Sequence, residues 1–176
     1  VLFRSIQRQF PDARFRFQLF ETGADFELGD VGVQTFSVPH DAMDPVGFVV
    51  ETGVANVGFV TDLGHATKLI LERIRQAHVL VLEANYDVRL LQEDTRRPWS
   101  TKQRIQSRHG HLSNDAAALV AAEIAGGLLR QVYLGHLSRD CNRPELARKA
   151  VARKLQETGA SHVILHPTSQ IGRAHV

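Results

Sequence analysis

The 176-residue chain carries 21 Lys and Arg residues and 19 acidic residues. The resulting formal net charge of +2 neither favours nor excludes a nucleic-acid partner. A single cysteine excludes an internal disulfide and is typical of a reducing compartment, so we expect the cytoplasm. No apolar run approaches the roughly 18 residues of a membrane span and no secretory signal is recognisable, so no membrane association is expected.

Both ends of the chain resemble translated sequencing adapter. Codons for residues 1–5 and 171–176 can be chosen so that the two strings are reverse complements over most of their length. We therefore interpret both segments as foreign, and residues 6–170 as a fragment of one domain that is open at both ends. Without Arg4 and Arg173 the basic and acidic residues balance.

The first half of the chain predicts β-strands joined by hairpins. Short runs of aromatic and β-branched residues alternate with turns that contain Gly23 or Gly53. The expected strands are 14–20, 25–28, 33–38, 47–50 and 57–61.

The second half predicts alternating helices and strands. Leu69, Ile70 and Ile74 recur at helical spacing within a helix expected at 66–76. Ser113 or Asn114 is a candidate N-cap for a later helix. Further helices are expected at 101–107, 114–125 and 144–158, and strands at 78–83, 131–134 and 161–165. Because no repeat or linker interrupts this order, we expect one α/β domain.

Three separated segments place a metal-seeking side chain directly after an expected strand. His40, Asp62 and His136 each follow an apolar run. Strand ends of this kind can converge at one edge of a sheet, so we predict a hydrolytic metal site with these three residues as ligands. Taken singly, each has a plainer interpretation, with Asp62 as the N-cap of the next helix and the histidines as structural residues.

Three polar residues are expected beside this site. His111 lies in a polar loop that opens a helix, and it is a candidate general acid or oxyanion donor or only part of the capping loop. Glu83 ends the strand expected at 78–83, and Asn85 follows it. A carboxylate at that position can orient a ligand imidazole, or it can be a solvated charge.

A cluster of basic residues surrounds the only tryptophan. Such a cluster can bind phosphates while the indole stacks on a base or sugar, and the alternative is a solvated helix face with Trp99 as a core anchor. Arg96 belongs to the cluster, and the candidate substrate-binding residues are Arg97, Trp99, Lys102, Arg104 and Arg108. Cys141 has no second cysteine at metal-ligand spacing, so we expect a buried or incidental thiol. The histidines assigned to structure are His65, His78, His162 and His166.

Five ordered segments resemble the metallo-β-lactamase-fold hydrolases, and among them the bacterial YycJ/WalJ-like group. The resemblance covers nearly all of residues 30–158. The chain also resembles, more distantly, the ribonuclease Z family. The segments are Pro39-His40-Asp41-Ala42, Thr61-Asp62-Leu63-Gly64, Leu82-Glu83-Ala84-Asn85, Gly110-His111-Leu112-Ser113-Asn114 and Gly135-His136-Leu137-Ser138.

The resemblance implies an αββα sandwich with a two-metal site at one edge of the sheets. His40 would bind one of two divalent ions, zinc or manganese, Asp62 would bridge both, and His136 would bind the second. His111 would lie near the attacking or leaving oxygen. The implied activity is phosphodiester hydrolysis by a metal-bridging water, as in a DNA exonuclease, with nucleic acid as the partner.

One family motif is missing from the chain. The His-x-His-x-Asp-His sequence, which supplies the other four ligands in the family, occurs nowhere in it. We therefore expect an N-terminally truncated fold that is inactive as it stands, because ligand number and geometry set metal affinity.

Two other classes of function remain open. The fold supports hydrolysis of thioesters, lactones or β-lactams, and the parent protein could instead be a non-catalytic nucleic-acid-binding member whose metal site has decayed. The basic cluster around Trp99 favours a phosphate substrate.

Overall fold

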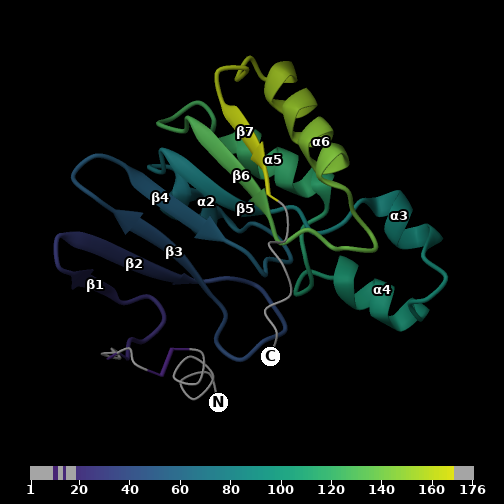
Figure 1. Ribbon diagram of the computed structural model, residues 1–176, viewed down its shortest axis with the longest axis horizontal. Helices are drawn as coiled ribbons and strands as arrows, with labels where there is room; N and C mark the ends of the chain where they lie inside the picture. Colours follow the sequence, from purple (N-terminus) through teal and green to yellow (C-terminus); the bar gives the residue numbers. More distant parts are fainter. Residues whose placement is uncertain (1–9, 12–13, 15–18, 169–176) are drawn as a thin grey trace.

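The computed structural model describes residues 10, 11, 14 and 19–168 (Figure 1). The segments interpreted as adapter, residues 1–5 and 171–176, lie outside this range, as does most of the strand predicted at 14–20. No helix in the described part of the chain is long and apolar enough to cross a membrane.

One mixed sheet forms the centre of the described residues, with its seven strands in chain order. Neighbouring strands from β1 to β4 pair antiparallel, and those from β4 to β7 pair parallel. The strands are β1 Asp25–Leu28, β2 Val31–Ser37, β3 Val46–Glu51, β4 Asn56–Val60, β5 Val79–Glu83, β6 Gln131–Gly135 and β7 Ile164–Pro167.

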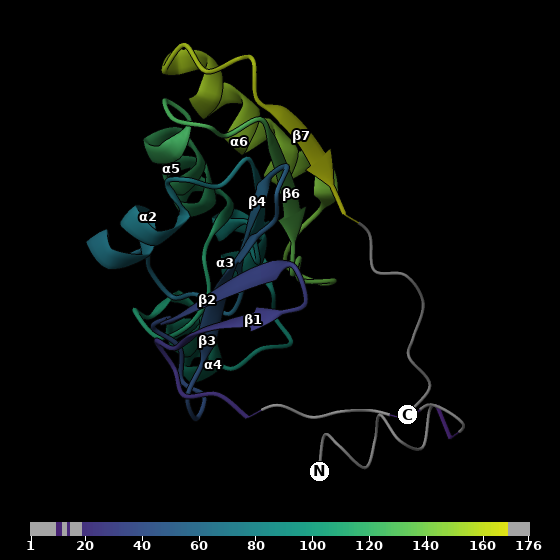
Figure 2. The same cartoon turned by 90° about the vertical axis from the view of Figure 1, so that its left-hand side faces the viewer.

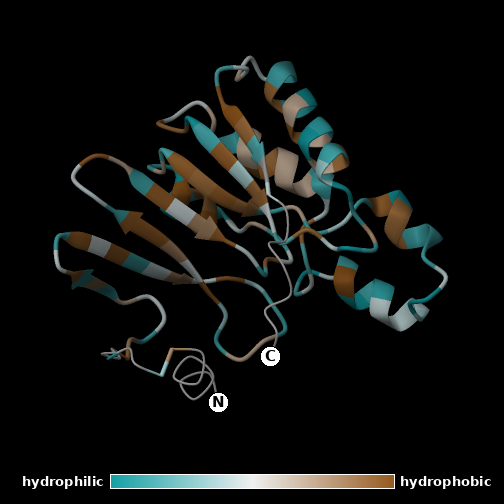
Figure 3. Ribbon diagram, viewed as in Figure 1, coloured by the Kyte–Doolittle hydropathy of each residue, from teal (hydrophilic) through white to brown (hydrophobic). Residues whose placement is uncertain are grey.

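Three helices make the crossovers between the parallel strands and cover one face of the sheet (Figure 2). They are α2 Lys68–Ile74, α5 Asn114–Ile124 and α6 Pro144–Glu157. Alternate strand residues such as Leu80, Leu82, Val132 and Leu134 are buried in the same core as residues of these helices. Figure 3 shows the hydrophobic residues running along β3 and β5, while α6 alternates between hydrophilic and hydrophobic positions.

The opposite face of the sheet is also apolar. Phe48, Phe59, Val81 and Tyr133 lie side by side in register on β3 to β6. They are only partly buried, and Phe59 keeps 41% of its surface exposed. The described residues thus supply one helix layer and one sheet of the expected sandwich, as the alternation of buried positions requires.

Two short helices form an arm beside the sheet, α3 Val88–Glu93 and α4 Trp99–Gln106 (Figure 1). Helix α3 was not predicted from the sequence. Its start is fixed by Asp87, whose side chain accepts a hydrogen bond of 3.0 Å from the Leu90 amide. The amine of Lys102 donates to the Gln92 carbonyl at 2.7 Å and so joins the two helices.

Two of the plainer alternatives and one expected boundary were wrong. Thr67, not Asp62, caps α2, because the Thr67 hydroxyl accepts from the Ile70 amide. Trp99 is no core anchor, since 65% of its surface is exposed. The strand expected at 161–165 starts at Ile164, because a turn occupies the preceding residues. The capping of α5 by Ser113 is confirmed, with a hydrogen bond from the Ala116 amide.

Candidate metal centre

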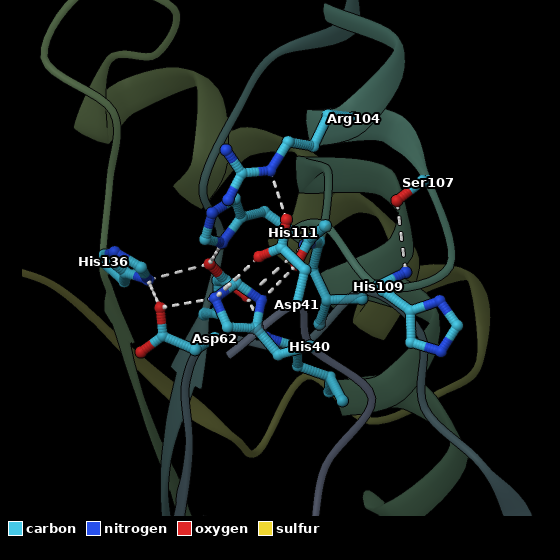
Figure 4. Close-up of polar contacts among 12 residues, drawn as sticks. His40, Asp41, Asp62, Arg104, Ser107, His109, His111 and His136 are labelled. Carbon is cyan, nitrogen blue, oxygen red and sulfur yellow. Dashed lines mark hydrogen bonds and ion pairs between the residues drawn. The ribbon is translucent and has the colours of Figure 1, made fainter. Parts of the chain in front are cut away.

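The parallel strands bring the predicted ligands to one edge of the sheet. Asp62 follows β4, Glu83 ends β5 and His136 follows β6, so the carboxyl ends of three adjacent strands carry them. His40 follows the antiparallel strand β2. The Asp62 carboxylate lies between two imidazoles, with Oδ1 3.6 Å from His40 Nε2 and 3.6 Å from His136 Nδ1 (Figure 4).

Two of these residues leave their strands in a strained conformation. Asp62 has φ of 54° and His136 has φ of 53°, in the left-handed region that non-glycine residues rarely adopt. The side-chain amide of Asn85 donates to the His136 carbonyl at 2.9 Å, and the Ser138 amide donates to the Asn85 carbonyl at 2.8 Å. Asn85 therefore holds the turn that directs His136 toward Asp62.

The His40 ring is oriented by a backbone carbonyl. Its Nδ1 donates to the Gly110 oxygen at 2.9 Å, which fixes the tautomer and leaves the Nε2 lone pair facing Asp62. A side chain on Gly110 is excluded, because a Cβ there would lie 2.2 Å from the Ile105 oxygen.

The residues present fit a divalent cation. An imidazole lone pair and a carboxylate oxygen face each other at 3.6 Å, an arrangement that a cation between them would stabilise. Zinc bonds of about 2.0–2.2 Å in a tetrahedron place neighbouring ligand atoms about 3.4 Å apart, close to this separation. Ligand atoms of His40, Asp62 and His111 lie within 4.8 Å of one another, as do those of Glu83, His111 and His136.

Glu83 links the histidines to the backbone of the site. Its side chain is fully buried, and Oε1 accepts from His111 Nδ1 at 2.7 Å and from His136 Nδ1 at 2.8 Å. Oε2 accepts from the Leu63 amide at 2.7 Å. The interpretation of Glu83 as a solvated charge was therefore wrong.

The electrostatics follow from these contacts. Burial raises the pKa of Glu83, but hydrogen bonds from His111, His136 and the Leu63 amide outweigh it, so the net pKa is lowered. The hydrogen bond to Glu83 raises the pKa of His136 against burial, and the charges of Glu83 and Asp62 add to the increase. A charged carboxylate is thus held beneath two imidazoles.

His111 occupies the middle of the site. Its ring centroid lies 4.9 Å from that of His40 and 5.1 Å from that of His136. His109, two residues earlier, points away from the cluster (Figure 4). The His111 loop therefore contributes one histidine to the site.

The basic residues around Trp99 do not form one free patch. Arg97 contacts Asp94 and lies 3.0 Å from Asp140, while Arg96 lies 2.8 Å from Asp140. Arg108 approaches His65 at 3.0 Å, and Lys102 is buried against α3. Arg104 contacts Asp41 next to His40, and its side chain is 71% exposed.

Sequence reasoning missed a buried pair of amides below the site. Asn114 and Asn142 exchange hydrogen bonds of 2.9 Å and 2.8 Å. Asn142 also donates to the Ala84 carbonyl at 2.7 Å, between Glu83 and Asn85. No motif marks Asn142, whereas Asp41, the other missed residue, could have been noted as the neighbour of His40.

The chain matches a known family over most of its length. A family model described as the β-lactamase superfamily domain matches residues 2–137. Exodeoxyribonuclease YycJ of Bacillus anthracis is 37% identical over 141 residues, which is 80% of this chain and 53% of that protein. Exodeoxyribonuclease WalJ of Streptococcus pneumoniae is 32% identical over 139 residues, 79% of this chain and 51% of that protein.

Solved structures show the same fold. The metallo-β-lactamase fold protein YhfI from Bacillus subtilis matches with a TM-score of 0.62 at 13% identity, covering 92% of this chain and 58% of that one. Zn²⁺-bound PqqB from Methylobacterium extorquens matches with a TM-score of 0.55 at 18% identity, covering 86% and 54%.

The chain spans about half the length of the curated relatives it matches. The family match, the identities and the α/β architecture nevertheless agree with the ordered motifs. The chain belongs to the metallo-β-lactamase-fold superfamily and is a YycJ/WalJ-like member of it.

Proposed function

We propose that this chain is part of a metal-dependent phosphodiesterase that degrades DNA. The observation that carries the proposal is the Asp62 carboxylate placed 3.6 Å from both His40 and His136. The relatives named exodeoxyribonucleases support DNA as the substrate. No comparable observation favours thioesters, lactones, β-lactams or a decayed site.

The geometry supports the following ligand roles. His40 would hold one divalent cation, zinc or manganese, His136 would hold a second, and Asp62 would serve both. When bound, such a pair supplies an acidic water and neutralises charge on the phosphate. The Gly110 carbonyl holds His40 through Nδ1 so that Nε2 faces Asp62, and Asn85 keeps His136 turned toward Asp62.

In this proposal His111 supplies the proton to the leaving oxygen. In the hydrolysis a water oxygen bonds to phosphorus and releases a proton, one phosphorus–oxygen bond breaks, and the leaving oxygen takes up a proton. Glu83 holds His111 by Nδ1, so the Nε2 atom remains to hold the proton that the leaving oxygen receives. Glu83 thereby orients both His111 and His136.

The residues of the basic cluster have different roles in this proposal. Arg104 is exposed next to His40 through its contact with Asp41, and Trp99 is exposed at the start of α4. Both contact the DNA in this proposal, together with Arg97, which lines the same cavity as His111 and His136. Lys102 is assigned to the junction of α3 and α4, and Arg108 to the loop that packs on His65.

Activity also needs ligands that this chain does not supply. We propose that residues 6–170 are part of a longer domain that contains His-x-His-x-Asp-His, and that the 176-residue chain by itself has no activity. Tight binding of two cations requires more than the three ligands described in residues 19–168.

The test uses the longer protein with its complete ligand set. Purified protein is assayed with zinc or manganese on DNA, on bis(p-nitrophenyl) phosphate, and on thioester, lactone and β-lactam substrates. We expect turnover of the phosphodiesters, loss with a chelator, and a loss of at least 100-fold in Asp62→Asn. His162→Ala, an exposed histidine remote from the site, is the matched control and should retain activity. Hydrolysis of an ester without any cleavage of DNA would contradict the proposal.

A further inference from the structure

A second feature lies against the histidines, a cavity of about 230 Å³ that we call the end pocket. His111 and His136 form part of its wall, so it opens directly onto the candidate metal centre. Its apolar lining comes from Tyr86, Leu91, Ile105 and Leu137, and its polar lining includes Asn85, Arg97 and Ser138.

The size of the end pocket limits its occupant. Pockets for drug-sized ligands have volumes of roughly 300–1,000 Å³, so a cavity of about 230 Å³ accommodates one small molecule. Polar and apolar groups share the lining about equally, which suits a flat heterocycle whose edge carries donors and acceptors. Arg97 also lines the cavity, and its guanidinium is paired with Asp94 and Asp140. A single nucleotide carries a heterocycle of this kind.

The walls of the end pocket are fixed by backbone hydrogen bonds. The Asp87 amide donates to the Cys141 carbonyl at 2.8 Å, and the Asn114 amide donates to the Tyr86 carbonyl at 2.9 Å. The Cys141 amide donates to the Ser138 hydroxyl at 3.2 Å. The first contact ties the segment after β5 to the segment after β6, the second ties it to the start of α5, and the third closes the turn after β6. The cavity therefore exists before a ligand arrives.

A smaller cavity lies on the other side of His111. It has a volume of about 190 Å³ and is lined by His40, Asp41, Thr101 and Arg104. His111 and Ile105 line both cavities. A DNA strand that enters past Arg104 would cross the metal centre at His111 and meet the end pocket next.

From this arrangement we infer that the end pocket holds the terminal nucleotide of a DNA strand. This inference rests on the proposed phosphodiesterase function and adds how the strand end is selected. One nucleotide fills the end pocket, so each hydrolysis adds one water across the last phosphodiester and releases one nucleotide and a shortened strand. The pocket is therefore the reason for cleavage from an end.

The experiment fills the end pocket from two of its lining residues in the longer protein. Leu137→Trp and Ile105→Phe are compared with Leu119→Trp, a control on the exposed face of α5. Each variant is assayed on a DNA strand and on p-nitrophenyl methyl phosphate, which has no nucleoside to place in the pocket. We expect the DNA-to-small-diester ratio of kcat/KM to fall at least tenfold in both filling variants, through KM for DNA, and not in the control.

Two further readouts need no turnover by a variant. The unmodified protein should release mononucleotides from the first cleavage onward, and dAMP should bind it at least tenfold more tightly than it binds Leu137→Trp, measured by calorimetry. First products of several nucleotides, equal dAMP affinity in the two proteins, or parallel losses on both substrates would overturn the inference. If the unmodified protein cleaves neither diester, the proposed function fails. The dAMP measurement still shows whether the end pocket binds a nucleotide.

Discussion

Replacement of Glu83 by glutamine separates the two halves of its hydrogen-bond network. One amide oxygen can still accept from the Leu63 amide, as Oε2 does now. The new NH₂ group takes the place of Oε1 and cannot accept from His111 or His136, which lie 2.7 Å and 2.8 Å away. The substitution therefore changes the histidines and leaves the backbone contact in place.

The expected loss of stability follows from the contacts removed. Hydrogen bonds to a charged group contribute about 1.5–3 kcal/mol each, and solvent reduces the value for His136, whose side chain is 38% exposed. We therefore expect Glu83→Gln to lower the free energy of unfolding by about 2–3 kcal/mol. Glu83→Ala also leaves the buried Leu63 amide unpaired, so its cost should reach about 3–5 kcal/mol.

The pH dependence gives a second readout. His136 has a raised pKa in the folded chain. Its contribution to folding stability is therefore full below the unfolded pKa of 6.5 and is lost as the pH rises through the folded pKa. Glu83 has a lowered pKa, so its contribution to folding stability is present above its unfolded pKa of 4.5 and is lost as the pH falls. The difference in the free energy of unfolding between wild type and Glu83→Gln should thus be largest near pH 6 and smaller at about pH 9.

The assay is denaturant unfolding of the metal-free 176-residue chain, combined with NMR titration of the histidine rings. The His136 pKa should fall toward 6.5 in Glu83→Gln. An unchanged His136 titration, or equal costs for the glutamine and alanine variants, would refute the reasoning.

Three further predictions concern the support of the site. Gly110→Ala places a Cβ 2.2 Å from the Ile105 oxygen and should cost about 1–3 kcal/mol in denaturant unfolding, whereas Gly53→Ala meets no atom within 4 Å and should be near neutral. Asn142→Ala removes the partner of Asn114 and should cost about 2–4 kcal/mol by the same measurement; a cost below 0.5 would contradict the role of the pair. Hydrogen bonds from Arg96 and, to a lesser extent, Arg97 lower the pKa of Asp140. Its contribution to folding stability is therefore present above the unfolded pKa of 3.8 and is lost at lower pH. Asp140→Asn should therefore destabilise the chain at pH 7 and make little difference near pH 2, and equal effects at both values would count against this ion pair.

The placement of the ligands could be predicted because strand ends have a sequence signal. An apolar run followed by Asp62 or His136 indicates a polar group at a sheet edge, and adjacent parallel strands bring such edges together. The same signal marked His40, although it follows the antiparallel strand β2, and the family resemblance agreed with it.

The supporting contacts had no such signal. Asn114 and Asn142 meet across 28 positions, and Glu83 joins two histidines whose ring orientations depend on the folded loops. Helix α3 is short, and its capping residue Asp87 resembles many turn residues. Lys102 looked like a free charge because its partner is a backbone carbonyl, which sequence composition does not reveal.

Anomalous scattering from crystals of the metal-loaded longer protein would test the central claim most directly. Bound zinc should give a peak about 2.0–2.2 Å from both His40 Nε2 and an Asp62 oxygen, with a second cation against His136 and the same carboxylate. Zinc bound elsewhere, with His40, Asp62 and His136 all outside its coordination sphere, would contradict the account.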